Sequence, residues 1–98
     1  MRFDERVWKL TARVPRGKVT TYRELARAMG NRAYRAVGNA LNRNPHAPVV
    51  PCHRVVKASG ELGGFAGGTA TKARMLRQEG ITVEHGRIVN FSRALFRF

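Results

Sequence analysis

The stretch TYRELARAMGNRAYRAVGNAL, residues 21–41, predicts two short helices joined by a tight turn. Thr21 can cap the first helix through its hydroxyl, and Glu24, three positions later, completes a capping box. The first helix is expected to run to Met29, and Gly30 suits the left-handed conformation that often ends a helix. This stretch therefore predicts the centre of a mainly helical fold.

The second helix of the pair is expected over residues 32–41, with Asn31 as its N-cap. Its two sides differ in character: Ala33, Ala36, Val37 and Ala40 line one, whereas Arg32, Arg35, Asn39 and Arg43 line the other. Two helices across a Gly-Asn turn are typical of a helix-turn-helix, although any helical hairpin would show the same apolar pattern. The arginines on the outer side favour contact with DNA.

The remaining predicted elements are short. Helices are expected over residues 3–12 and 69–78, extended segments at 19–20 and 55–56, a hairpin over 81–89, and an apolar tail over 91–98 that docks on the core. In the helix over 69–78, Thr69 or Thr71 is the expected cap, Ala73 and Leu76 point inward, and Lys72, Arg74 and Arg77 point outward. The fold class is therefore mainly α with small β elements, a winged helix-turn-helix-like single domain over residues 1–98.

The charge of the chain points to an anionic partner. Nineteen Lys and Arg face six Asp and Glu, which gives a formal net charge of +13 and a pI near 11.7 in 98 residues. A basic excess of this size in one small domain indicates a nucleic-acid-binding surface. A ribosomal or chromatin protein, or a protein on anionic lipid, would share it, so charge alone does not indicate catalysis.

Cys52 is the only cysteine, within the segment Pro51-Cys52-His53-Arg54-Val55. A single cysteine excludes an internal disulfide, which fits an intracellular location. No apolar run approaches the roughly 20 residues that span a bilayer, so no membrane partner is expected, and no signal peptide is seen at the start. Basic neighbours favour the reactive thiolate, but a lone cysteine is more often a small buried apolar residue. The spacing by itself leaves both readings open.

The segment around Cys52 resembles the active-site motif of the alkylguanine-DNA alkyltransferases, also called methylated-DNA–protein-cysteine methyltransferases. The resemblance rests on several short motifs that occur in that family's order and at about its spacing. They are Gly17-Lys18-Val19-Thr20-Thr21-Tyr22, Arg35-Ala36-Val37-Gly38, Asn44-Pro45, Pro51-Cys52-His53-Arg54-Val55, Gly67-Gly68 and Glu79-Gly80. It covers residues 3–80 and the family's C-terminal, DNA-binding domain only.

The resemblance implies a chemistry that needs no metal or redox cofactor. Cys52 would accept an alkyl group from the exocyclic oxygen of guanine. His53 would be the general base, acting through a bound water, and Glu79 would orient it. Tyr22 would donate a proton to the leaving guanine ring. The chain would then be a single-turnover DNA repair protein.

The resemblance also implies how DNA is held. Arg35 would be the finger that fills the gap left by an extruded nucleotide, which costs a few kcal/mol to flip. The helix carrying Ala36 and Gly38 would lie in the minor groove, with further contacts from Tyr22, Arg32, Asn39 and Arg43. The expected partner is double-stranded DNA containing alkylated guanine, bound by a monomer.

The glycine-rich loop would form the substrate pocket, with Asn44 fixing the turn before Cys52. Phe65, Ala66 and Gly67 are the expected pocket residues of this loop. Phe65 and Ala66 stand where the family often has a tyrosine followed by a serine. Phe65 can wall the pocket, but Ala66 offers only its backbone N–H to the guanine oxygen. Three alternatives stay open: an alkyltransferase-like protein that binds the lesion without repairing it, a basic helix-turn-helix protein without lesion chemistry, and, more distantly, a cysteine hydrolase.

Overall fold

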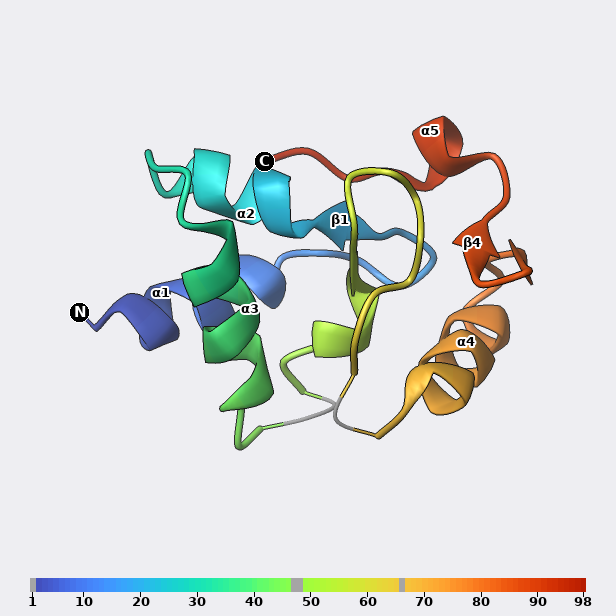
Figure 1. The fold of residues 1–98 in the computed structure, drawn as a ribbon, viewed down its shortest axis with the longest axis horizontal. Helices are drawn as coiled ribbons and strands as arrows, with labels where there is room; N and C mark the ends of the chain where they lie inside the picture. Colours follow the sequence, from blue (N-terminus) through green and yellow to red (C-terminus); the bar gives the residue numbers. More distant parts are fainter. Residues whose placement is uncertain (1, 47–48, 66) are drawn as a thin grey trace.

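The computed structural model describes residues 2–46, 49–65 and 67–98. It is mainly helical with small sheets, which confirms the predicted fold class (Figure 1). The helices are α1 (Phe3–Thr11), α2 (Tyr22–Ala28), α3 (Tyr34–Asn42), α4 (Thr69–Gln78) and α5 (Phe91–Ala94), with a 3₁₀ turn at Cys52–Arg54. The strands are β1 (Thr20–Thr21), β2 (Val55–Val56), β3 (Val83–Glu84) and β4 (Arg87–Ile88). None of the helices within these ranges is long and apolar enough to cross a membrane.

The first core cluster forms where α1, α2 and α3 pack together. Its buried residues are Val7, Leu25, Ala26, Met29, Val37, Ala40, Leu41 and Val55. Thr21 caps α2 as predicted, because the Glu24 backbone N–H donates to Thr21 Oγ1 at 3.0 Å. Gly30 takes the predicted left-handed conformation after α2, with φ +78°. Helices α2 and α3 thereby form the helix-turn-helix.

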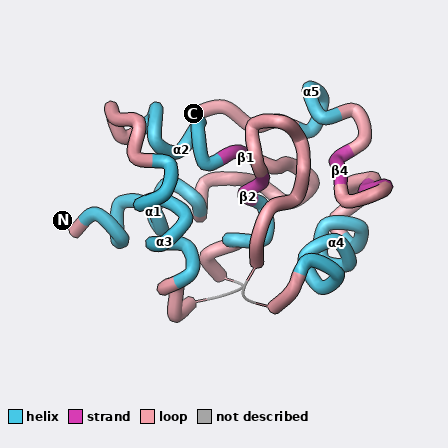
Figure 2. The backbone as a smooth tube through the Cα atoms, viewed as in Figure 1, coloured by secondary structure: helices cyan, strands magenta, loops and turns pink. Residues whose placement is uncertain are grey.

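Strands β1 and β2 join this helical half to the segment that carries Cys52. They pair in parallel, with Thr20 beside Val55 and Thr21 beside Val56 (Figure 2). Because β2 directly follows the 3₁₀ turn and β1 directly precedes α2, this pairing brings Tyr22 and Cys52 toward the same cavity.

A second core cluster lies between α4 and the hairpin β3–β4, on the side of the molecule away from α1 (Figure 1). Its buried residues are Val19, Val56, Leu62, Ala73, Leu76, Ile81, Val83 and Ile88. The C-terminal tail runs from α5 back toward α2 (Figure 1). Phe91 packs on the second cluster and Phe98 on the first, so the prediction that the tail docks on the core is confirmed.

The start of α3 differs from the sequence prediction. The helix begins at Tyr34 rather than at Arg32, and its N-cap position is Ala33. The Asn31 side chain does not cap it. Asn31 Oδ1 instead accepts the Ala33 backbone N–H at 2.9 Å, which closes a local turn and keeps Arg32 outside the helix. A side chain engaged in such a turn competes with helix initiation at its own position.

Helix α4 also corrects two predictions. No threonine caps it: the N-cap position is Gly68, at φ +92°, without a side-chain hydrogen bond. Lys72 does not point outward but has no exposed surface. The reason is helical spacing, because residues four apart share a face. Lys72 therefore lies on the same face as Leu76, which is buried in the second cluster.

Candidate active site

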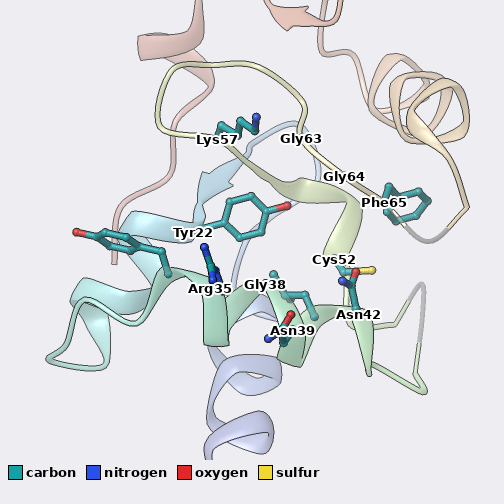
Figure 3. Close-up of a pocket in the computed structure, with 12 residues that line it drawn as sticks. Tyr22, Arg35, Gly38, Asn39, Asn42, Cys52, Lys57, Gly63, Gly64 and Phe65 are labelled. Atoms are coloured by element: carbon teal, nitrogen blue, oxygen red, sulfur yellow. The ribbon is translucent and has the colours of Figure 1, made fainter.

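Cys52 opens the 3₁₀ turn and lines a cavity of about 620 Å³. The Cys52 residue is half-buried. Tyr22 comes from the start of α2, Arg35 and Gly38 from α3, and Phe65 from the glycine-rich loop, so segments far apart in the sequence form the walls (Figure 3). The volume lies within the 300–1,000 Å³ typical of small-molecule sites and accommodates a purine.

Hydrogen bonds from Asn44 hold the connection that leads to Cys52. Asn44 Nδ2 donates to the Val50 carbonyl at 3.0 Å, and Asn44 Oδ1 accepts the His46 backbone N–H at 2.9 Å. The Cys52 N–H in turn donates to the same Val50 carbonyl at 2.8 Å. Asn44 thus ties together the two ends of this connection, which is the turn-fixing position that the resemblance gives it.

His53 is buried behind Cys52 and contacts Glu79 at the end of α4. His53 Nε2 and Glu79 Oε2 are 2.9 Å apart. The Arg54 guanidinium grips the same carboxylate, with Nε 2.8 Å from Oε1 and Nη2 2.8 Å from Oε2, and its Nη1 donates to the Val14 carbonyl at 2.9 Å. Such a fork is the strong, bidentate form of a charge-assisted hydrogen bond.

The environment keeps Glu79 ionised. Burial raises the pKa of Glu79, but the hydrogen bonds from Arg54 and His53 outweigh it, and the pKa lies below its ordinary value. An ionised carboxylate only accepts hydrogen bonds, so the proton must lie on His53 Nε2. In neutral His53 the other ring nitrogen, Nδ1, is then the proton acceptor. The contacts of Glu79 with His53 and Arg54, here called the histidine–carboxylate clamp, therefore select the tautomer that a general base requires.

Tyr22 carries a protonated hydroxyl into the cavity. Burial, together with the nearby Cys52, raises the pKa of Tyr22 above its ordinary value, so its hydroxyl remains a donor near neutral pH. The glycine-rich segment approaches this ring closely. Gly63 has φ +74°, and a Cβ at this position would lie 3.5 Å from Tyr22 Oη. The positive φ, rather than lack of space, is what favours glycine at this position.

Lys72 is a site residue that the sequence reasoning missed. Its Nζ donates to the carbonyls of Val55 and Leu62, both at 2.6 Å, and to that of Gly64 at 3.3 Å. Burial lowers the pKa of Lys72 to about 8, although Cys52 acts in the opposite direction. Lys72 thus joins strand β2 to the glycine-rich segment that walls the cavity. The sequence signal that could have predicted the burial of Lys72 is its position four residues before Leu76, on the same face of the helix.

The residues that the sequence placed on the DNA-facing side fall into two groups. Arg35, Gly38 and Asn39 line the cavity of Cys52, and Ala36 and Arg32 line a neighbouring depression on the outside of α3. Arg43 is not with them. Its Nε and Nη2 bind the Asp4 carboxylate at 2.7 and 2.9 Å, so its charge is matched by α1.

Three predicted pocket residues remain. Phe65 lines the cavity (Figure 3). A Cβ at Gly67 would lie 3.0 Å from Phe65 Cε2, so a side chain there would displace the Phe65 ring. The third, Ala66, lies outside the described residues.

The fold and the site together define a helix-turn-helix domain in which a cysteine faces a purine-sized cavity and is backed by a histidine–carboxylate pair. The sequence matches the family described as 6-O-methylguanine DNA methyltransferase, DNA binding domain, over residues 2–81. The chain belongs to this family, and the match includes all the residues of the clamp and Cys52.

Individual relatives and structures agree with this assignment. A methylated-DNA–protein-cysteine methyltransferase of Methanosarcina mazei is 49% identical over 78 residues, which are 79% of this chain and 49% of the relative. The structure of Mycobacterium tuberculosis OGT in complex with DNA superposes with a TM-score of 0.78 at 45% identity, over 81% of this chain and 50% of that one. The chain thus spans about half the length of the curated relatives it matches.

A further structure matches from end to end. S. pombe Atl1, in complex with damaged DNA containing O6-carboxymethylguanine, superposes with a TM-score of 0.84 at 29% identity and covers 100% of both chains. The similarity therefore includes the hairpin and tail, which the family match over residues 2–81 does not reach.

Proposed function

We propose that this protein repairs DNA by transferring an alkyl group from 6-O-alkylguanine to Cys52, irreversibly and once per molecule. The observation that carries the proposal is the composition of one cavity: a half-buried thiol, a protonated Tyr22 hydroxyl and an arginine-bearing helix face the same purine-sized space. The histidine–carboxylate clamp behind the thiol supplies the base. Membership of the family supports the same reaction.

The proposed reaction begins with removal of the thiol proton. Glu79 holds His53 with Nδ1 as acceptor, and the proton of Cys52 passes to His53 through a solvent molecule. The thiolate then attacks the alkyl carbon of the lesion. The new S–C bond forms as the C–O bond breaks, and the electron pair remains on the guanine.

The leaving guanine needs a proton, and Tyr22 is the proposed donor. Its raised pKa makes the free phenolate unfavourable, so donation is coupled to the negative charge that develops on the ring. The proton held by His53 returns to Tyr22 through solvent. The products are alkylated Cys52 and unmodified guanine, and the thioether cannot leave, so the protein is consumed.

The proposed partner is double-stranded DNA, and an intracellular location follows from it. The target oxygen of a stacked base is out of reach of a sulfur inside a cavity, so the nucleotide must be extruded. Arg35 is exposed beside the Cys52 cavity and forms no ion pair within the described part of the chain. It is therefore the proposed residue that occupies the vacated position in the stack.

Intact-mass spectrometry after incubation with a duplex containing 6-O-methylguanine tests the proposal. The expected result is a stoichiometric mass gain of one methylene on the peptide that contains Cys52, and no gain with Cys52→Ser. Unmodified duplex is the second control. No mass gain in wild type under conditions where the lesion is bound would overturn the transfer reaction.

A second candidate function is binding of the lesion without transfer. The observation that favours it is the end-to-end match to S. pombe Atl1, whose crystal structure contains damaged DNA with O6-carboxymethylguanine. The same experiment separates the two functions, because a lesion sensor binds the damaged duplex more tightly than the undamaged one and gains no mass. A basic protein without lesion chemistry would bind both duplexes equally.

A further inference from the structure

Tyr34 is a large side chain that the fold leaves in solvent. It is the first residue of α3, 44% exposed, and immediately precedes Arg35. Among the large apolar side chains of the described ranges, only Tyr34 and Val49 are exposed to this extent. An aromatic ring usually contributes its area to a core or an interface. Neither the family resemblance nor the transfer reaction gives this ring a task.

Three adjoining cavities share Tyr34. The first is that of Cys52, and the second, of about 610 Å³, lies between α2 and the turn and is lined by Arg23, Arg27 and Arg32. The third lies along the outside of α3, next to Arg35. Among the described residues, Tyr34 is common to all three, so it lies where the proposed reaction cavity adjoins an arginine-lined one.

The charge around Tyr34 suits a nucleotide. The lining of the three cavities contains no carboxylate. Within the described ranges Arg23 and Arg32 form no ion pair, and Arg27 only approaches Glu24 at 3.6 Å. Guanidinium groups match phosphate oxygens bidentately. An exposed aromatic ring offers a face on which any base can stack.

We propose that Tyr34 and the arginine-lined cavity form a nucleotide subsite beside the reaction cavity. The ring of Tyr34 stacks on the base next to the extruded nucleotide, and Arg23, Arg27 and Arg32 bind the neighbouring phosphates. This inference deepens the proposed function and rests on it for the extruded nucleotide. The physical reason is that extrusion exposes one face of each of the two flanking bases. The Arg35 guanidinium covers one of these faces in the gap, and the adjacent aromatic ring covers the other.

The test compares Tyr34→Ala and Tyr34→Phe with wild type. Phenylalanine keeps the aromatic face and loses only the hydroxyl, so it separates stacking from a hydrogen bond. Val49→Ala is the matched control, because it removes the other exposed apolar side chain and lies outside the lining of the three cavities. Each variant is assayed for affinity to damaged and undamaged duplexes and for transfer from the free 6-O-alkylated base.

Base–aromatic stacking predicts that Tyr34→Ala binds the damaged duplex about 5- to 100-fold more weakly than wild type. Affinity for the undamaged duplex, whose bases stay stacked, is expected to fall less. Tyr34→Phe and Val49→Ala should remain within about twofold of wild type. Transfer from the free base should not change in any variant, because that substrate has no neighbouring base.

Three results would overturn the subsite. They are wild-type affinity of Tyr34→Ala for the damaged duplex, an equal loss in Tyr34→Phe, and an equal loss of transfer from the free base. The third would show damage to the reaction cavity instead. If wild type transferred nothing but bound the damaged duplex selectively, the transfer reaction would fail while the affinity series would still decide the role of Tyr34.

Discussion

Because the Lys72 ammonium is buried, we expect the free energy of unfolding to rise with pH above pH 8, which can be measured. The pKa of Lys72 is lowered from its ordinary value of 10.5 to about 8 in the folded protein. Each pKa unit corresponds to about 1.4 kcal/mol. Below pH 8, the buried ammonium therefore lowers the free energy of unfolding by about 3 kcal/mol, relative to a lysine that keeps its ordinary pKa.

The sign of the dependence follows from proton binding. Between pH 8 and 10.5 the folded protein has released the proton from Lys72, whereas the unfolded chain still binds it. Stability rises with pH wherever the unfolded state binds more protons. The contribution of Lys72 to the free energy of unfolding should therefore increase by roughly 2–3 kcal/mol between pH 7 and 10.

Urea unfolding of wild type and Lys72→Met across this pH range measures the effect. The two proteins share all other titrating groups, including Tyr22, so the difference between their free energies of unfolding isolates Lys72. Methionine leaves the carbonyls of Val55 and Leu62 without their donor, so the variant is expected to be less stable at neutral pH. Its curve should nevertheless lack the rise that wild type shows above pH 8.

Parallel curves would refute the reasoning, because they would mean that Lys72 titrates like an exposed lysine. If Lys72→Met did not fold, an NMR titration of the wild-type lysine side chains would decide the question directly. One lysine should lose its proton near pH 8, well before the others.

Three further predictions concern the proposed function. Cys52→Ala should abolish transfer and leave lesion affinity largely intact, since the sulfur reacts while other groups hold the DNA; residual methyl transfer by this variant would exclude Cys52 as acceptor. The net charge of +13 predicts that the binding constant K for undamaged duplex falls as salt is added, with a slope of log K against log salt of about −0.9 for each phosphate neutralised. An affinity that is independent of salt would contradict this. Arg35→Ala should impair single-turnover transfer from duplex far more than from the free base, with Arg35→Lys intermediate; equal losses on both substrates would argue against extrusion as the step that Arg35 assists.

Local signals made the helical centre of the fold predictable. The Thr21 side-chain cap and the glycine after α2 act within a few residues, so the sequence shows the residues involved in each. The family motifs, likewise, predicted the segments that the structure brings around Cys52. The tail was predictable because its apolar residues had no other place to be buried.

The predictions that failed concern residues whose surroundings are made by distant parts of the chain. A lysine is rarely buried without a partner, and the carbonyls that stabilise Lys72 come from other segments of the chain. The Arg43–Asp4 pair was likewise not predicted, because Asp4 lies 39 residues earlier in the sequence; contact of Arg43 with DNA stays a prediction. The exposure of Tyr34 was not predicted, because it depends on how α3 packs against α2 rather than on its sequence neighbours.

The C-terminal tail has a consequence for the size of lesion that the proposed repair site would accept. Val19 accepts the Phe96 N–H and donates to the Ala94 carbonyl, and the Phe98 ring lies under Arg13 beside the first core cluster. The tail thus links the second cluster to the first. The Cys52 cavity opens between α3 on one side and the glycine-rich segment on the other. Because α3 belongs to the first cluster and the glycine-rich segment is anchored in the second through Leu62, we expect a tail that links the clusters to limit how far these two walls can spread. We therefore expect selection for bulkier alkyl groups to loosen the contacts of Phe96 and Phe98, outside the cavity, as well as to change the residues that line it.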